Sequence, residues 1–133
     1  MKFKFVSSEK DLRRKIKRSK IGTTDFEFAD TPMGVVFGKV KFENISSPYE
    51  LIKEHCLKNG IAINDDYPED KFINTMIIPE LKVFDNKQTE LKGWGAYFIG
   101  MDSDGFEIQF GGITSDLMQS EFKHHYDEYY KTE

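Results

Sequence analysis

Several short stretches of this sequence alternate apolar and polar residues, and turn residues separate them. Alternation with a period of two predicts β-strands that bury one face. The strands predicted in this way are 2–6, 25–30, 35–44, 72–78, 80–85, 94–101 and 106–110. Two of the connections have clear turn chemistry, namely 31–34 with Pro at its second position and 102–105 with a terminal Asp-Gly. Short turns between consecutive strands favour an antiparallel or mixed sheet over a doubly wound parallel one.

Three segments carry helix signals. The clearest begins at Ser47, a capping residue, and continues with Pro at the first helical position and Glu50 in a capping box. Gly60 supplies the stop for this helix. A basic helix is predicted over 9–20, and a helix with an aromatic stripe over 115–130.

These signals predict an α+β fold with an antiparallel or mixed sheet of about six to seven strands and three helices. The basic N-terminal helix is expected at the edge of the sheet, because only two apolar residues anchor it. No repeat, low-complexity tract or linker divides the sequence, and 133 residues is a typical domain length. We therefore expect one domain over residues 1–133.

The composition indicates whether this domain is ordered and in which compartment we expect it. Apolar residues make up 38% of the chain and aromatic residues 14%, which argues against intrinsic disorder. A single cysteine excludes an internal disulfide framework and favours a reducing compartment. The first residues lack the apolar run of a signal peptide, and no apolar stretch approaches the ~20 residues that span a bilayer. The sequence predicts a cytoplasmic protein without membrane contact.

Charge is distributed very unevenly along the chain. Residues 1–20 hold nine Lys and Arg against two acids, a net charge of +7. The rest of the chain holds ten Lys and Arg against twenty-one acids, a net charge of −11. Such segregation determines which partners each surface can attract.

The predicted N-terminal helix gathers its cations on the side away from its apolar residues. The candidate anion-binding residues are Lys10, Arg13, Arg14, Lys17 and Arg18. This spacing can follow the phosphates of a nucleic acid or a nucleotide, or match an acidic protein surface. The alternative is a solvent-exposed helix without a binding role, whose cations face the acidic residues of its own domain. The overall charge of −4 weighs against nucleic acid, because nucleic-acid-binding domains are usually basic.

A competing hypothesis gives the acidic body the functional role. An inhibitor or immunity-type protein could block a basic partner enzyme through clustered carboxylates. The candidate residues are Asp65, Asp66, Glu69 and Asp70, in a segment that we expect to form an acidic loop over 64–70.

Aromatic residues provide a further set of interface candidates. Trp and Tyr combine an apolar body with a polar tip and are enriched in the residues that dominate binding energy. Among these residues, we expect Trp94, Tyr129 and Tyr130 to be exposed.

No catalytic constellation emerges from the sequence. Cys56 falls on the apolar stripe of its helix and is expected to be a small buried hydrophobe. His124 and His125 adjoin acids at helical spacing, but adjacent helical residues point about 100° apart and further ligands are not evident. We expect no catalytic residues, no metal and no cofactor, hence a non-catalytic binding protein; a small metal-dependent enzyme is the third alternative. The oligomeric state is open.

Overall fold

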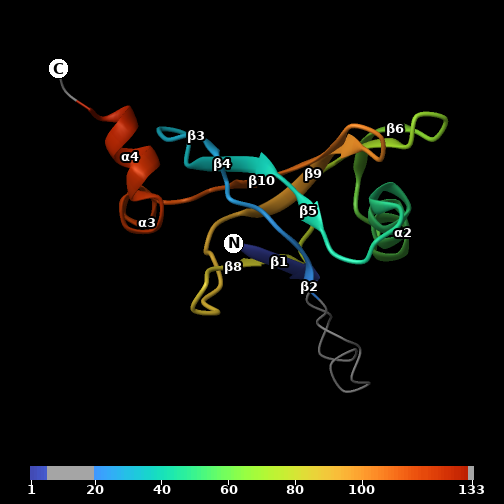
Figure 1. The fold of residues 1–133 in the computed structure, drawn as a ribbon, viewed down its shortest axis with the longest axis horizontal. Coiled ribbons are helices and arrows are strands. Elements are labelled where there is room, and N and C mark those ends of the chain that lie inside the picture. Colours follow the sequence, from blue (N-terminus) through green and yellow to red (C-terminus); the bar gives the residue numbers. More distant parts are fainter. Residues whose placement is uncertain (6–19, 132–133) are drawn as a thin grey trace.

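The computed structural model describes residues 1–5 and 20–131, which form ten strands and three helices (Figure 1). The strands are β1 (Lys2–Phe5), β2 (Lys20–Thr23), β3 (Phe28–Asp30), β4 (Val35–Lys39), β5 (Lys41–Phe42), β6 (Ile63–Tyr67), β7 (Phe72–Thr75), β8 (Leu81–Phe84), β9 (Gly95–Met101) and β10 (Gly105–Gly111). The helices are α2 (Pro48–Asn59), α3 (Ser115–Glu121) and α4 (Lys123–Tyr129).

The strands build two antiparallel sheets. The smaller has the order β5-β2-β1-β8, and the larger has the order β3-β4-β10-β9-β7-β6. The predicted α+β class is confirmed, but a count of six to seven strands is too low. The predicted basic helix, with its place at the edge of the sheet, lies outside the described residues. Lys20, predicted as the last residue of that helix, instead begins β2, where it pairs with Lys4 of β1.

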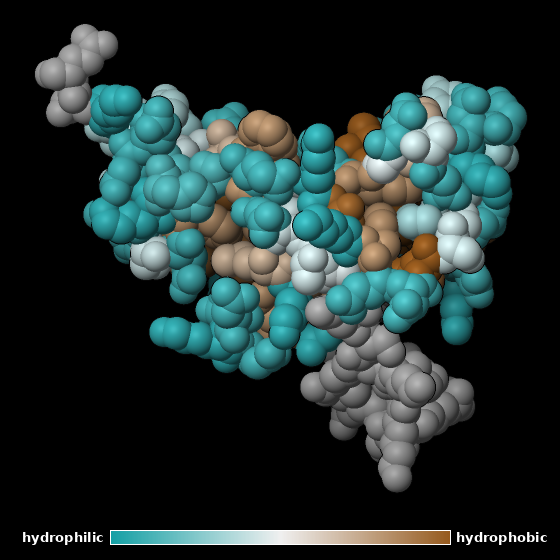
Figure 2. Space-filling model, in the orientation of Figure 1, coloured by the Kyte–Doolittle hydropathy of each residue, from teal (hydrophilic) through white to brown (hydrophobic). Residues whose placement is uncertain are grey.

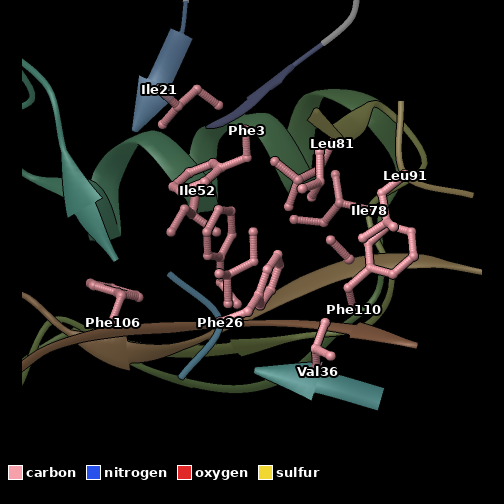
Figure 3. Packing of buried hydrophobic residues seen from close by; sticks show 14 of the residues in the cluster. Phe3, Ile21, Phe26, Val36, Ile52, Ile78, Leu81, Leu91, Phe106 and Phe110 are labelled. Carbon is pink, nitrogen blue, oxygen red and sulfur yellow. The ribbon is translucent and has the colours of Figure 1, made fainter. Parts of the chain in front are cut away.

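The two sheets face each other across a shared aromatic core. Phe3 of the smaller sheet packs edge-on against Phe98 of the larger sheet, with ring centroids 5.6 Å apart. Phe42 contacts Phe106 in the same way at 5.7 Å. Figure 3 shows Phe3 and Ile52 between these layers, on the side of the larger sheet toward which Phe106 of β10 points. The buried face of the larger sheet is therefore the one that looks toward the smaller sheet.

The division into two sheets arises in the predicted strand 35–44. The backbone N–H of Val40 donates to the carbonyl of Phe106 at 3.0 Å, where β4 ends. The next two residues, Lys41–Phe42, pair instead with β2 of the smaller sheet. The alternating segment 35–44 therefore contributes strands to both sheets. Its pairing with strands distant in the sequence determines where β4 ends and β5 begins.

Helix α2 begins and ends where its sequence signals predict. The side chain of Ser47 accepts a hydrogen bond from the Glu50 backbone N–H, and Gly60 has the left-handed conformation that favours glycine, with φ 69°. Ile52 and Cys56 lie on the inner side of α2 and are fully buried. These contacts hold α2 against the buried face of the larger sheet, beside β7 and β9.

The predicted helix over 115–130 is divided into α3 and α4 by Phe122. This residue has φ −125° and ψ 46°, which breaks the helical path. Its ring is buried and packs edge-on against Phe26 at 5.9 Å, so burial of the ring accompanies the break. Neither these helices nor α2 has the length and apolar composition that a membrane span requires.

Candidate interaction surface

The larger sheet has a second face, directed away from the core. Residues directly opposite each other in an antiparallel pair point to the same side, so the strand register assigns each side chain to a face. We call the side opposite Val36, Phe98 and Ile108 the outer face. Its members are Phe28, Asp30, Val35, Phe37, Lys39, Asp65, Tyr67, Phe72, Asn74, Tyr97, Ile99, Met101, Glu107 and Gln109. Every one of them is half-buried or exposed.

Aromatic rings occupy both ends of the outer face. Phe28 pairs with Phe37, and their rings stack with centroids 5.5 Å apart. At the other end Tyr67 pairs with Phe72, with centroids 5.7 Å apart. Phe28 is 50% exposed and Tyr67 is 49% exposed. These rings pack on one another while much of their apolar surface faces water.

Figure 2 shows the outer face in profile, along the upper edge of the molecule, because the larger sheet lies above the smaller sheet in this view. This edge is hollowed between the end that carries α4 and β3 and the end that carries β6, as located in Figure 1. Apolar side chains, drawn brown and tan, lie along that edge on both sides of hydrophilic ones, drawn teal. Exposed apolar surface next to polar residues is typical of an interaction site.

Polar side chains in the middle of the outer face bond to one another. The hydroxyl of Tyr97 donates to Oε1 of Gln109 at 2.6 Å, and Nε2 of Gln109 donates to Oε1 of Glu107 at 2.9 Å. Nδ2 of Asn74 donates to Asp65 at 3.1 Å. Burial, together with the nearby Glu107 carboxylate, raises the pKa of Tyr97. The phenol therefore stays protonated and keeps its role as a donor.

The acidic cluster predicted from the sequence is divided between two sides of the molecule. Residues 63–67 form strand β6 rather than a loop, so the prediction of a loop over 64–70 is wrong for this part. A register shift follows Ile63, after which Asp65 belongs to the outer face and Asp66 to the opposite face. Glu69 and Asp70 are exposed in the turn that follows. The carboxylates of Asp65 and Asp66 therefore cannot contact the same partner surface.

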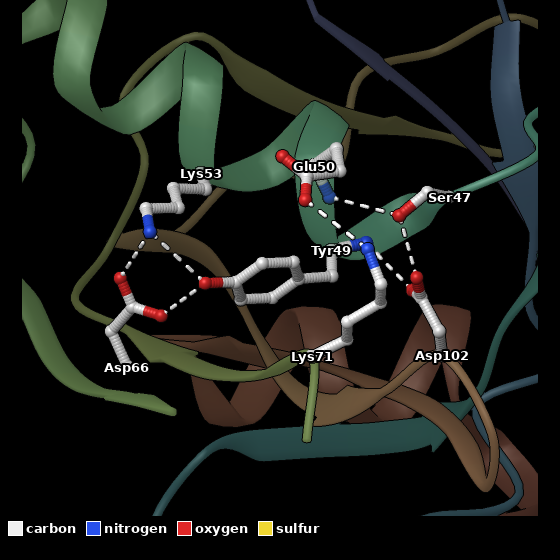
Figure 4. Close-up of polar contacts among 7 residues, drawn as sticks. All are labelled: Ser47, Tyr49, Glu50, Lys53, Asp66, Lys71 and Asp102. Atoms are coloured by element: carbon white, nitrogen blue, oxygen red, sulfur yellow. Dashed lines mark hydrogen bonds and ion pairs between the residues drawn. The ribbon is translucent and has the colours of Figure 1, made fainter. Parts of the chain in front are cut away.

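Asp66 belongs to an internal network that the sequence analysis missed (Figure 4). The hydroxyl of Tyr49, on α2, donates to Asp66, and Lys53 contacts the Tyr49 hydroxyl at 3.1 Å and Asp66 at 3.0 Å. Burial, and then the hydrogen bond to Asp66, raise the pKa of Tyr49. Tyr49 and Lys53 are four residues apart, which predicts that they share one face of the helix. Nothing in the local sequence around Asp66 indicates that β6 lies against that face. This network fastens α2 to β6.

A second internal contact joins α2 to the turn between β9 and β10. Asp102 accepts hydrogen bonds from the hydroxyl of Ser47 at 2.5 Å and from the backbone N–H of Tyr49 at 2.9 Å. Lys71 also reaches α2, with its ammonium 3.3 Å from Glu50 (Figure 4). Asp102 thus acts as a helix cap supplied by a distant turn.

Trp94 is the most exposed of the predicted aromatic candidates, at 78%. It lies against Gly112, and beside it is a cavity of about 160 Å³. The cavity walls include Ile77, Pro79 and Leu91. Trp94 is therefore available to a partner, although it lies beyond the end of the outer face.

Tyr129 and Tyr130, the other aromatic candidates, lie at the C-terminal end of α4. Tyr129 is 58% exposed and Tyr130 is 49% exposed. The ring of Tyr130 packs against Tyr126 with centroids 4.7 Å apart. Both are exposed, but they belong to a different element from Trp94, and their role at an interface stays a prediction.

The other residues examined for chemistry are internal or paired. Cys56 is fully buried, and burial, with a contribution from Glu80, raises its pKa to about 11. His125 bonds through Nε2 to the carbonyl of Phe26 at 2.7 Å. Its ring centroid lies 4.0 Å from that of His124, although adjacent helical residues are expected to point apart. Among the described residues, no group of three or more His, Cys, Asp or Glu could hold a metal ion.

All five candidate anion-binding residues, Lys10, Arg13, Arg14, Lys17 and Arg18, lie outside the described residues. Their role stays a prediction from the sequence.

Comparison with known proteins returns no match among family models, curated proteins or solved structures. Any functional proposal must therefore rest on the residues of this chain.

Proposed function

We propose that this protein is a non-catalytic binding protein that holds a partner macromolecule on its outer face. The observation that carries this proposal is the pair of aromatic clusters, Phe28 with Phe37 and Tyr67 with Phe72, in which Phe28 and Tyr67 are about half exposed. Covering such rings removes apolar area from water, and that stabilises association by about 25 cal/mol per Å² before its costs are counted.

The polar groups of the outer face support recognition rather than chemistry. Tyr97, Gln109 and Glu107 form a chain of hydrogen bonds that fixes their side chains. Fixed donors and acceptors between aromatic clusters give orientation to a partner at low entropic cost. The best nucleophile of the chain, Cys56, is buried and carries a raised pKa, which supports a structural role for it.

The experiment that tests the proposal compares partner capture by variants of the outer face. A double Phe28→Ser, Tyr67→Ser variant should lose partners that the wild type captures from extracts of the native host, as identified by mass spectrometry. Leu57→Ser provides the matched control, because Leu57 is a 67% exposed apolar residue on α2. Equal capture by the double variant and the wild type would reject the outer face as the binding surface.

A second candidate surface is the basic segment that contains Lys10, Arg13, Arg14, Lys17 and Arg18, with an anionic partner such as nucleic acid, nucleotide phosphates or an acidic protein. The support for it is the charge asymmetry of the sequence. In the described body, by contrast, several lysines already form ion pairs with acids of the same chain, among them Lys53 with Asp66 and Lys123 with Asp127.

Charge reversal separates this second surface from the first. An Arg14→Glu, Lys17→Glu, Arg18→Glu variant should abolish binding of nucleic acid and remove its salt dependence, because each neutralised phosphate releases counterions. Excess absorbance at 260 nm that high salt removes would be the first sign of such binding. Binding that survives the triple change would exclude the basic segment.

A cytoplasmic location remains a prediction, based on the single cysteine of the sequence.

A further inference from the structure

The geometry points to a specific kind of occupant for the outer face, namely a cationic amphipathic helix of a protein partner. This inference rests on the proposed function, because it names the partner class of the same surface. It joins three observations: the sign of the charge on the face, the order of its apolar and polar side chains, and its span across the strands.

The charge of the outer face is predominantly negative. Asp30, Asp65 and Glu107 contribute three carboxylates, against the single ammonium group of Lys39. Complementary charge steers association and disfavours partners of the same sign. The phosphates of a nucleic acid would face these carboxylates, so a basic polypeptide is the better match.

Like charge also weighs against a second copy bound face to face. A two-fold interface brings the same patch of both protomers together. Asp65 and Glu107 of one copy would then lie against the same carboxylate-bearing face of the other copy, where the lysine at position 39 could neutralise only part of the charge. A cationic partner meets no such repulsion.

The order of side chains matches a helix laid across the strands. One row of paired residues runs from Lys39 through Glu107, Ile99 and Asn74 to Asp65. It crosses five strands, and at ~4.8 Å per strand step the row is about 19 Å long. An α-helix rises 1.5 Å per residue, so about 13 residues would cover it.

Apolar side chains flank this polar row on both sides. Phe28 and Phe37 lie on one side of it, and Tyr67, Phe72 and Met101 lie on the other. A helix with apolar residues at helical spacing could contact both clusters while its lysines or arginines reach Glu107 and Asp65. Recognition of an apolar helical stripe by a hydrophobic groove is an established mode of peptide binding.

The test uses defined probes and the full-length protein. A synthetic peptide of about 14 residues, LKKLLKLLKKLLKL, supplies leucine and lysine at helical spacing, and its glutamate counterpart, LEELLELLEELLEL, supplies the opposite charge. Binding is measured by calorimetry, and the contacted residues are mapped by backbone amide chemical shifts in NMR. We expect the lysine peptide alone to bind, with shifts confined to the six strands of the larger sheet.

Two substituted proteins decide whether the outer face is responsible. Asp65→Asn with Glu107→Gln keeps the hydrogen bonds of these side chains but removes both charges, and should weaken binding about tenfold. Glu54→Gln with Glu121→Gln removes the same charge from exposed positions off the face and should change binding less than twofold. Equal weakening by both pairs, or shifts outside the larger sheet, would overturn the inference.

Other occupants give distinct results. A thymidine oligonucleotide that shifts the same amides in place of the lysine peptide would assign the face to nucleic acid. A concentration-dependent dimer that is lost in the Phe28→Ser, Tyr67→Ser variant would assign it to a second copy. If no probe binds but host partners are still lost in that double variant, the inference fails while the proposed function stands.

Discussion

The Tyr49 hydroxyl on α2 donates a hydrogen bond to the Asp66 carboxylate on β6, and Lys53 contacts both groups. This contact bridges seventeen positions in the sequence and joins a helix to the last strand of the larger sheet. Tyr49→Phe removes the donor and leaves the ring in place. Because Tyr49 is buried, we expect the free energy of unfolding in urea to fall by about 1–2 kcal/mol.

A double-mutant cycle checks the cause of that loss. Asp66→Asn alone should also destabilise, and the double variant should lose less than the two single losses combined, since both remove the same contact. Strict additivity would show that Tyr49 stabilises the fold through packing alone.

The same contact predicts a response to acid. Burial acts to raise the pKa of Asp66, but the hydrogen bonds from Tyr49 and Lys53 outweigh it, and the pKa lies below its usual value. An aspartate in an unfolded chain titrates near pH ~3.9. The stabilisation is therefore present above about pH 4 and is lost as the pH falls through the lower folded-state pKa.

Urea titrations between about pH 6 and pH 3 measure this response. The wild type should lose stability over this range, and Asp66→Asn should lose less, because the variant lacks the titrating carboxyl. A variant with the same acid dependence as the wild type would assign the loss to other carboxylates.

Cys56 offers a label for opening of the core beneath α2. It is the only cysteine in the sequence, it is fully buried, and burial raises its pKa to about 11. The reactive species of a thiol is the thiolate, so a disulfide reagent at about pH 8 should modify the native protein far more slowly than the protein in urea. Spectrophotometric labelling rates measure this, and equal rates in both states would show that the thiol is accessible.

The raised pKa of the Cys56 thiol also predicts a response to alkali. The buried, protonated thiol stabilises the fold below its unfolded-state pKa, and that contribution is lost as the pH rises toward 11.

Local chemistry accounts for the parts of the fold that the sequence predicts well. Ser47, Pro48 and Gly60 mark the start and end of α2 in the local sequence, although Asp102 adds a distant contact to the start. Two of the features that the sequence missed depend on distant contacts. Val40 leaves the larger sheet where it bonds to Phe106, and the helix break at Phe122 accompanies packing of its ring on Phe26. Neither partner is adjacent in sequence, so periodicity alone cannot show it.

The interaction surface shows the same division between local and distant causes. The sequence names Trp94 as an interface candidate, and its side chain is exposed. Alternation also predicts which residues of a strand share a face, such as Tyr97 with Ile99. It does not show which face the smaller sheet and α2 cover, and the register shift after Ile63, which separates Asp65 from Asp66, has no sequence signature. The outer face therefore becomes visible only when both sheets are in place.

The position of Trp94 leads to a prediction about two glycines. Gly112 has φ 74°, and a Cβ there would lie 2.3 Å from Cγ of Trp94. Gly105 also has a left-handed backbone, with φ 95°, but a Cβ there would meet nothing within 4 Å. Alanine at either position carries the backbone strain, of about 1–2 kcal/mol, and only alanine at position 112 must also displace the indole.

Comparison of Gly112→Ala with Gly105→Ala therefore isolates the contact with Trp94. Trp94 is the only tryptophan in the sequence, so tryptophan fluorescence, excited selectively over tyrosine, reports on this site alone. We expect Gly112→Ala to shift the emission spectrum and to lower the free energy of unfolding more than Gly105→Ala does, while Gly105→Ala leaves the emission unchanged. Identical spectra and equal stability losses would mean that the indole does not rest on the glycine backbone, and the cavity beside it would then lack a fixed wall for any partner side chain.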